Sequence, residues 1–269
     1  MIRNRRISII TPVYAPRAEY LGETYKSLEA QTLPPGWEWE WLIQQDGPEG
    51  GDLDGHVPAD ERISLRVSSR WGGQALARNL ALARASGSLV KVLDADDVLT
   101  DGALRRDIAM LDAAPDIAYT ISRVVNYHPD GTTTRFPENP DPGPIPIGAL
   151  LPYWQHHDEP QVHPASLCVR HEILVALGGW MAVTTSEDTG VLLALNAVSS
   201  GYFIGEPGLL YRVWPGQTTT TRASDDERAA VLRLIALRAQ ELLNGTTTAQ
   251  AQRDGHELDT ARTSTGPEV

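Results

Sequence analysis

The chain has 269 residues, of which 41% are hydrophobic, so it can bury a full core as one large domain or as a domain with an appendage. Its formal net charge of −12 at pH 7 argues against nucleic acid as the main partner, and against anionic lipid bound through a polybasic patch. We recognise no signal peptide and no apolar run of transmembrane length, and the single cysteine excludes an intrachain disulfide, so a cytoplasmic protein is expected.

The amino-terminal half alternates short apolar runs with amphipathic segments. Strands are predicted by β-branched or alternating apolar residues at 7–10, 39–43, 63–67, 89–93 and 117–121. Apolar residues at helical spacing predict helices at 19–30, 76–83 and 104–111, and the second of these has Leu76, Leu80 and Ala83 on one apolar face. This alternation predicts an α/β fold with a mostly parallel sheet and right-handed crossovers.

Between about residue 129 and residue 164 the prolines cluster and the periodicity is lost, which indicates a long loop, such as a lid or a segment that faces a substrate. The polar residues His156, His157, Asp158 and His163 lack the regular spacing of a zinc-ligand pair. We interpret them as polar residues of this loop.

Regular structure is predicted again after residue 166. A strand is expected at 167–169, a short helix at 172–177 and a longer helix from Ser186. Ser224-Asp225-Asp226-Glu227 is typical of a capping box and begins a final helix that reaches Leu243. The residues after Gly245 are mostly polar and predict disorder. We therefore divide the chain into 1–128, 129–244 and a disordered tail, 245–269.

Polar residues follow three of the predicted strands. Thr11-Pro12-Val13-Tyr14 ends the first strand, Asp46-Gly47 the second, and Asp94-Ala95-Asp96-Asp97 the strand near residue 90. In a parallel sheet these three ends lie at the carboxyl edge, where ligands of α/β sheets bind. Two aspartates spaced one apart suit a hydrated divalent cation that also binds a diphosphate.

Together these motifs resemble those of family 2 glycosyltransferases, which have the GT-A fold. Residues 7–14 are similar to the family's opening strand, and residues 93–97 to its DXD element. Further similar motifs follow the family's order: Ala77-Arg78-Asn79, Ala85-Ser86-Gly87, Gly178-Gly179-Trp180, Ser186-Glu187-Asp188 and Tyr211-Arg212-Val213. Each motif alone is weak, but the ordered set covers roughly residues 5 to 220 and is specific.

The resemblance implies a mostly parallel nucleotide-binding sheet flanked by helices, with an acceptor-side subregion. Residues 1–128 are then the half that binds a nucleotide-sugar donor, usually a UDP-sugar. Residues 129–244 are the acceptor half with the catalytic base. The implied reaction transfers the sugar, with inversion, to a hydroxyl of a small molecule or a glycan.

The resemblance also implies roles for the residues that bind the donor. Thr11, Pro12 and Tyr14 are expected to line the nucleotide pocket. Asp46 is expected to accept a hydrogen bond from the nucleotide base, and Arg78 to approach the nucleotide base or the diphosphate.

The resemblance also implies which residues bind the metal and which residue is the general base. Asp94 is expected to contact the ribose and the metal, and Asp96 to be the main ligand of Mg²⁺ or Mn²⁺. Asp188 is the expected general base, with Glu187 as the second candidate. The cation would stabilise charge on the leaving diphosphate, and a carboxylate can take the proton of the attacking hydroxyl. Direct displacement needs no serine or cysteine nucleophile.

Two other functions are open to this sequence. A sugar-phosphate nucleotidyltransferase would also use a nucleotide-binding α/β sheet and Mg²⁺, but the Gly-rich basic loop it needs after the first strand is missing here. A non-catalytic nucleotide-sugar-binding protein is the other alternative. One position departs from the family: Trp214 stands where many members have a histidine, which puts metal affinity in question. The proline-rich segment and the final helix are candidates for a homodimer contact.

Overall fold

A computed structural model describes residues 5–48, 53, 55–136, 139–214, 217 and 224–263. The helices are η1 Ala15–Tyr20, α1 Leu21–Glu29, α2 Gln74–Leu82, α3 Ala103–Ala113, α4 Leu150–His157, η2 Pro164–Ser166, α5 His171–Ala176, α6 Glu187–Val198 and α7 Asp225–Thr263. The strands are β1 Arg6–Val13, β2 Glu38–Gln45, β3 Ile63–Val67, β4 Leu89–Val92, β5 Val98–Leu99, β6 Ile117–Tyr127, β7 Thr133–Arg135, β8 Gly143–Ile145, β9 Cys168–Arg170 and β10 Ser200–Arg212.

One large sheet organises the molecule, with strand order β3-β2-β1-β4-β9-β6-β10-β5. β3, β2, β1 and β4 are parallel neighbours, and β6 is parallel to β10. β9 lies between β4 and β6 and runs antiparallel to both. The predicted α/β class is confirmed, and the parallel strands on the β4 side carry the predicted donor motifs.

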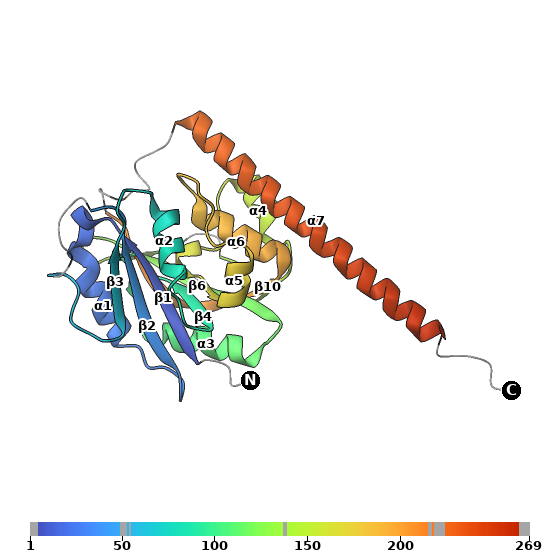
Figure 1. The fold of residues 1–269 in the computed structure, drawn as a ribbon, viewed down its shortest axis with the longest axis horizontal. Coiled ribbons are helices and arrows are strands. Elements are labelled where there is room, and N and C mark those ends of the chain that lie inside the picture. Colours follow the sequence, from blue (N-terminus) through green and yellow to red (C-terminus); the bar gives the residue numbers. More distant parts are fainter. Residues whose placement is uncertain are drawn as a thin grey trace.

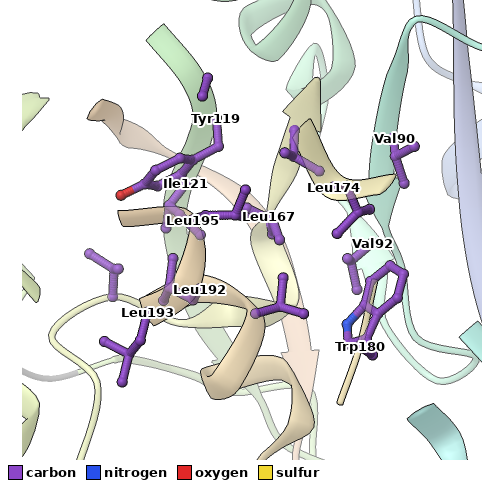
Figure 2. Close-up of a cluster of buried hydrophobic side chains, with 14 of the residues drawn as sticks. Val90, Val92, Tyr119, Ile121, Leu167, Leu174, Trp180, Leu192, Leu193 and Leu195 are labelled. Carbon is purple, nitrogen blue, oxygen red and sulfur yellow. The ribbon is translucent and has the colours of Figure 1, made fainter. Parts of the chain in front are cut away.

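The sheet separates two apolar cores because strand side chains alternate between its faces. In β1, Ile7 and Ile9 face the core under α1 and α3, whereas Ile10 faces the core under α2, α4, α5, α6 and α7. Figure 2 shows part of the second core, where Trp180 packs near Val90 and Val92 of β4. In Figure 1, α7 crosses the molecule beside α6 and extends past it. None of the helices in the described residues is long and apolar enough to cross a membrane.

Several predictions about single elements were wrong. The segment 129–164 is not one long loop, since it contains β7, β8, α4 and the start of η2 in its described part. α4 forms because Leu150, Leu151 and Trp154 recur at helical spacing and are all buried. The long strand β10 was not predicted, because its glycines, its proline and three register shifts hide its alternation.

The ends of the chain also differ from expectation. The predicted capping box is present at the start of α7, where Ser224 Oγ accepts the Glu227 N–H and Glu227 Oε2 accepts the Ser224 N–H. However, α7 does not end near Leu243: it continues to Thr263, so residues 245–263 of the predicted disordered tail are helical. Residues 264–269 of the predicted tail lie outside the described residues.

Candidate active site

The predicted strand ends meet at one edge of the sheet. β2, β1 and β4 are neighbours, so Asp46, the end of β1 and Asp94 lie side by side at the carboxyl ends of three parallel strands. The turn after β4 is held by the Asp97 N–H, which donates to the Asp94 carbonyl at 3.2 Å. This arrangement concentrates carboxylates where the chain leaves the sheet.

Arg78 joins two parts of the site that are far apart in sequence. Its Nη2 donates to Asp94 Oδ1 at 2.7 Å, and its Nη1 donates to Glu187 Oε1 at 2.5 Å. The Arg78 side chain is 2% exposed, and although burial acts to lower its pKa, the neighbouring carboxylates raise it overall. A buried guanidinium in this position stays charged and fixes both carboxylates.

The next residue, Asn79, also joins α2 to the segment that precedes α6. Its side chain donates to the Trp180 carbonyl at 2.8 Å and accepts the Trp180 N–H at 2.9 Å. Gly179 has a left-handed φ of 70°, and a Cβ there would lie 2.2 Å from Asn79 Oδ1, so a side chain cannot be accommodated. Trp180 itself is 2% exposed and belongs to the apolar core, so it is not a platform for a sugar.

The two carboxylates at the start of α6 are in different surroundings. Glu187 is buried and bound to Arg78, whereas Asp188 is only partly buried and its Oδ1 accepts the Thr189 N–H at 2.6 Å. Burial raises the pKa of both carboxyls, and the charge of Arg78 opposes this effect. Ser186, just before them, has a φ of 59°, a strained conformation for a non-glycine residue of the kind found at functional sites.

Residues at the end of β10 and just after it form hydrogen bonds with residues 94–97, which we call the aspartate turn. Arg212 N–H donates to Asp97 Oδ1 at 3.0 Å and Arg212 Nε donates to the Asp96 carbonyl at 2.8 Å. Trp214 Nε1 donates to Asp96 Oδ2 at 2.8 Å, and its ring lies 5.6 Å from that of Tyr20. Trp214 therefore contacts the predicted main metal ligand directly, as a hydrogen-bond donor.

The predicted residues at the ends of β1 and β2 are mostly occupied by internal contacts. Thr11 is fully buried, and its hydroxyl donates to the Leu93 carbonyl and accepts the Trp41 indole N–H. Pro12 is buried, whereas Tyr14 is 42% exposed. Asp46 accepts the N–H groups of Gly72 and Gly73, each at 2.8 Å, and so holds the loop that precedes α2.

Sequence reasoning did not assign a role to His163, although it lies close enough to Asp94 for that charge to act on its pKa. Burial lowers the pKa of His163 to about 4, and the charge of Asp94 opposes the shift. Its Nδ1 accepts the Ala165 N–H, so the neutral ring carries its proton on Nε2. Its ring packs against Phe136 and Tyr211. The only sequence signal was a histidine directly before a proline.

Comparisons with known proteins identify the family. Residues 8–169, more than half of the chain, match the model of "Glycosyl transferase family 2". The chain belongs to glycosyltransferase family 2. In TuaG of Bacillus subtilis (strain 168), whose name assigns it provisionally to teichuronic acid biosynthesis as a glycosyltransferase, 94 residues are 38% identical, covering 34% of this chain and 36% of TuaG.

A second relative of this family 2 chain is the uncharacterized protein y4gI of Sinorhizobium fredii (strain NBRC 101917 / NGR234), which is 33% identical over 120 residues, 42% of this chain and 13% of y4gI. The chain thus spans little more than a third of TuaG and a smaller share of y4gI. Among solved structures, residues 1–349 of S. aureus TarS in complex with UDP-GlcNAc match with a TM-score of 0.67 and 18% identity, over 90% of this chain and 71% of that one. The complex of TarS 1–349 with UDP matches with a TM-score of 0.65 and 16% identity, over 90% and 70%. These structures show that the family 2 chain has the GT-A fold.

The oxygen donors at the aspartate turn suit a hard divalent cation. Asp94 is 27% exposed at its side chain, and burial raises the pKa of Asp96, although the Trp214 hydrogen bond opposes the shift. A nearby cation would relieve that unfavourable burial of a carboxylate. In the part of the chain that the structure describes, no three His, Cys, Asp or Glu side chains form a metal cluster. A cation here would therefore need oxygens from the substrate as well, as Mg²⁺ sites commonly do.

Proposed function

We propose that this chain is an inverting glycosyltransferase that moves a sugar from a UDP-sugar to an acceptor hydroxyl. The observation that carries the proposal is the position of Arg78, which binds Asp94 of the DXD element and Glu187 beside Asp188. Because one side chain contacts both segments, this contact supports a single site that contains the candidate donor-binding residues and the candidate base. Membership of family 2 supports the reaction class, and the fold shared with TarS, which binds UDP and UDP-GlcNAc, supports a uridine nucleotide.

We assign the donor to residues 1–128 and the acceptor to residues 129–244. The donor half supplies Asp46, Asp94 and Asp96 from the ends of parallel strands. Tyr14 offers an exposed ring at the end of β1 that suits contact with the nucleotide, whereas Thr11 acts by holding β1, β2 and the aspartate turn together.

Asp94 and Asp96 would hold Mg²⁺ or Mn²⁺ together with the diphosphate. When bound, the cation stabilises the negative charge that develops on the leaving nucleoside diphosphate. Arg78 keeps one oxygen of Asp94 fixed, and Trp214 does the same for one oxygen of Asp96. Both aspartates are thus oriented before any ligand arrives, which reduces the reorganisation needed in the transition state.

Asp188 is the better candidate for the general base. Glu187 is buried and occupied by Arg78, whereas Asp188 is more accessible and lies at the N-terminus of α6, where the helix dipole favours the carboxylate. Asp188 takes the proton of the acceptor hydroxyl as the oxygen forms its bond to the anomeric carbon. The bond from that carbon to the phosphate oxygen breaks on the opposite face, and the diphosphate leaves with the electron pair, so the configuration inverts.

The proposal is tested by comparing Asp188→Asn with Glu187→Gln. We expect Asp188→Asn to lower kcat by about 10² to 10⁴-fold, because it removes the proton acceptor, without weakening UDP binding. Glu187→Gln keeps the side-chain shape and an acceptor oxygen for Arg78, so its kcat should fall much less. The measurements are release of UDP from UDP-sugars with glycan acceptors, and calorimetric binding of UDP with Mn²⁺. Equal kcat for Asp188→Asn and wild type would reject Asp188 as the base.

Binding to Asp96→Ala separates the proposed function from its alternatives. Loss of metal-dependent UDP binding in this variant would support the donor site. UDP binding by wild type without turnover of any UDP-sugar would favour a nucleotide-sugar-binding protein. Turnover of a sugar phosphate with UTP would favour a nucleotidyltransferase.

A further inference from the structure

The solvent-exposed face of α2 carries large apolar side chains. Leu76 and Leu80, one helical turn apart, are 37% and 39% exposed, although their spacing predicted a buried face. The small side chains of Ala75, Ala77 and Ala81 pack inward instead. Just before the helix, Trp71 is 66% exposed. Leu82 is also buried, so the helix turns two of its three leucines toward solvent.

The orientation of α2 is set by the active site. Arg78 and Asn79 must face inward to bind the carboxylates and the Trp180 backbone, and this fixes which side of the helix remains outside. That requirement explains the rotation of the helix, but it does not explain why leucines occupy the exposed positions. A contiguous exposed apolar surface commonly marks a place where another component binds.

The charge around this face is opposite to that of the protein. The net charge of −12 argues against a polybasic patch on the protein as a whole, yet residues 62–93 contain no aspartate or glutamate and six arginines or lysines. Three of these, Arg62, Arg78 and Lys91, form salt bridges with carboxylates outside that segment or at its edge. Arg66 at the end of β3 and Arg84 after α2 lie close together, since burial and the charge of Arg66 both lower the pKa of Arg84. Among the described residues, no carboxylate forms a salt bridge with Arg66, Arg70 or Arg84.

We define the α2 face as Arg66, Arg70, Trp71, Leu76, Leu80 and Arg84, and we propose that it docks on an anionic lipid bilayer. Leucines on the outside of a helix and an exposed tryptophan just before it suit the boundary between headgroups and acyl chains. The exposed side chains of Arg66 and Arg70 complement anionic headgroups, whereas Arg84 is half-buried and donates to Gln44 and to the Ile43 carbonyl. The surface is a helix side and an exposed loop tryptophan, a shape that inserts into an interface.

Docking through this face would place the candidate active site at the membrane surface. Trp71 is adjacent to Gly72 and Gly73, whose N–H groups bind Asp46 at the carboxyl edge of the sheet. If the proposed function holds, an acceptor embedded in the bilayer through a lipid anchor would be within reach of that edge. The docking itself requires neither donor nor acceptor, so it can be tested separately from the reaction.

The experiment measures co-sedimentation of the full chain with vesicles of phosphatidylcholine alone and of phosphatidylcholine with one-third phosphatidylglycerol. We expect binding to the phosphatidylglycerol vesicles, weakened by salt, and little binding to phosphatidylcholine. Arg66→Gln combined with Arg70→Gln should weaken binding by about 25-fold, at about 1 kcal/mol for each arginine near the surface. Trp71→Ser should also weaken it.

The matched control is Leu237→Ser on α7, which removes an apolar side chain that is 56% exposed but lies outside the α2 face. It should bind vesicles as wild type does. Thermal melting and UDP binding of every variant show that the fold is intact. The proposal is overturned if wild type does not bind phosphatidylglycerol vesicles, if the α2-face variants bind as well as wild type, or if Leu237→Ser is the variant that loses binding.

Discussion

Two buried cations, Arg78 on α2 and Lys91 on β4, differ in the exposure of the carboxylates that they bind. Lys91 Nζ donates to Asp107 Oδ2 at 2.8 Å and to the Ser166 carbonyl at 2.6 Å, and both side chains of the pair are at most 1% exposed. Arg78 is shared by Asp94 and Glu187, of which Asp94 is 27% exposed, and its Nε has no hydrogen-bond partner among the described residues. The first network is closed, whereas the second opens onto the edge of the sheet.

The difference separates a structural ion pair from one to which we assign a functional role. Asp107 also accepts the Thr120 hydroxyl, so the Lys91 network joins β4, α3, β6 and η2 inside the core. A closed pair of this kind holds elements together and has no capacity for a ligand. The Arg78 network includes Asp94, whose side chain is 27% exposed at the end of β4, so this network can reach a ligand, as the proposed function requires. Each network can be broken independently.

The largest effect on stability is expected for Lys91→Met. The substitution leaves the Asp107 carboxylate buried without a cation, which we expect to lower the free energy of unfolding by about 3 to 5 kcal/mol. Urea denaturation followed by circular dichroism measures the change. In the double variant Lys91→Met with Asp107→Leu, no buried charge remains, so much of the loss should be recovered. A Lys91→Met protein as stable as wild type would contradict the structural role.

Arg78→Lys should affect activity more than stability. Lysine keeps the positive charge, but its single ammonium cannot bind Asp94 and Glu187 with the fixed geometry of a guanidinium. We expect kcat/KM for glycosyl transfer to fall about 100-fold, because the carboxylates at the site are displaced, with a smaller loss of unfolding free energy than in Lys91→Met. Steady-state kinetics and urea denaturation of the same preparation provide both numbers.

The control for that substitution is Arg62→Lys. Arg62 forms a salt bridge with Asp60 at 2.6 Å, but its side chain is 41% exposed, so the pair should contribute little. Neither activity nor stability should change much in Arg62→Lys. If Arg78→Lys behaved in the same way, the comparison between the closed and the open network would fail.

The sequence predicted the aspartates at the strand ends, but not the Arg78 contact that joins Asp94 to Glu187. The strands before Asp46 and Asp94 are visible as short apolar runs, and the rule for parallel sheets brings their ends to one edge. The contact between Arg78 and Glu187 joins residues 109 positions apart, and no local pattern encodes it. The resemblance to the family assigned both residues to the site, but it predicted that Arg78 approaches the nucleotide base or the diphosphate rather than Glu187.

The rotation of α2 shows why the remaining fold was harder to predict. Hydrophobic periodicity placed Leu76 and Leu80 on the buried face, since burial of leucine is the larger apolar gain. In the structure, the hydrogen bonds of Arg78 and Asn79 decide the orientation, and the alanines and Leu82 are buried in place of Leu76 and Leu80. Tertiary polar contacts therefore override the local pattern at the site, where such conflicts are expected.

His163 allows a last test, because it lies between the two networks. It precedes Ser166, whose carbonyl binds Lys91, and its pKa responds to Asp94, which Arg78 binds. Burial lowers the pKa of His163 from 6.5 to about 4 in the folded chain. Between these values the unfolded chain binds the extra proton, so the free energy of unfolding falls as the pH drops from 6.5 toward 4.

His163→Gln should flatten that dependence, since glutamine does not titrate there. The slope lost is at most about 1.4 kcal/mol per pH unit, which is the value for one proton, and urea denaturation at several pH values measures it. His156→Gln, at an exposed position of α4, is the matched control and should retain the wild-type slope. An unchanged slope in His163→Gln would mean that burial of the ring against Phe136 and Tyr211 does not keep it neutral.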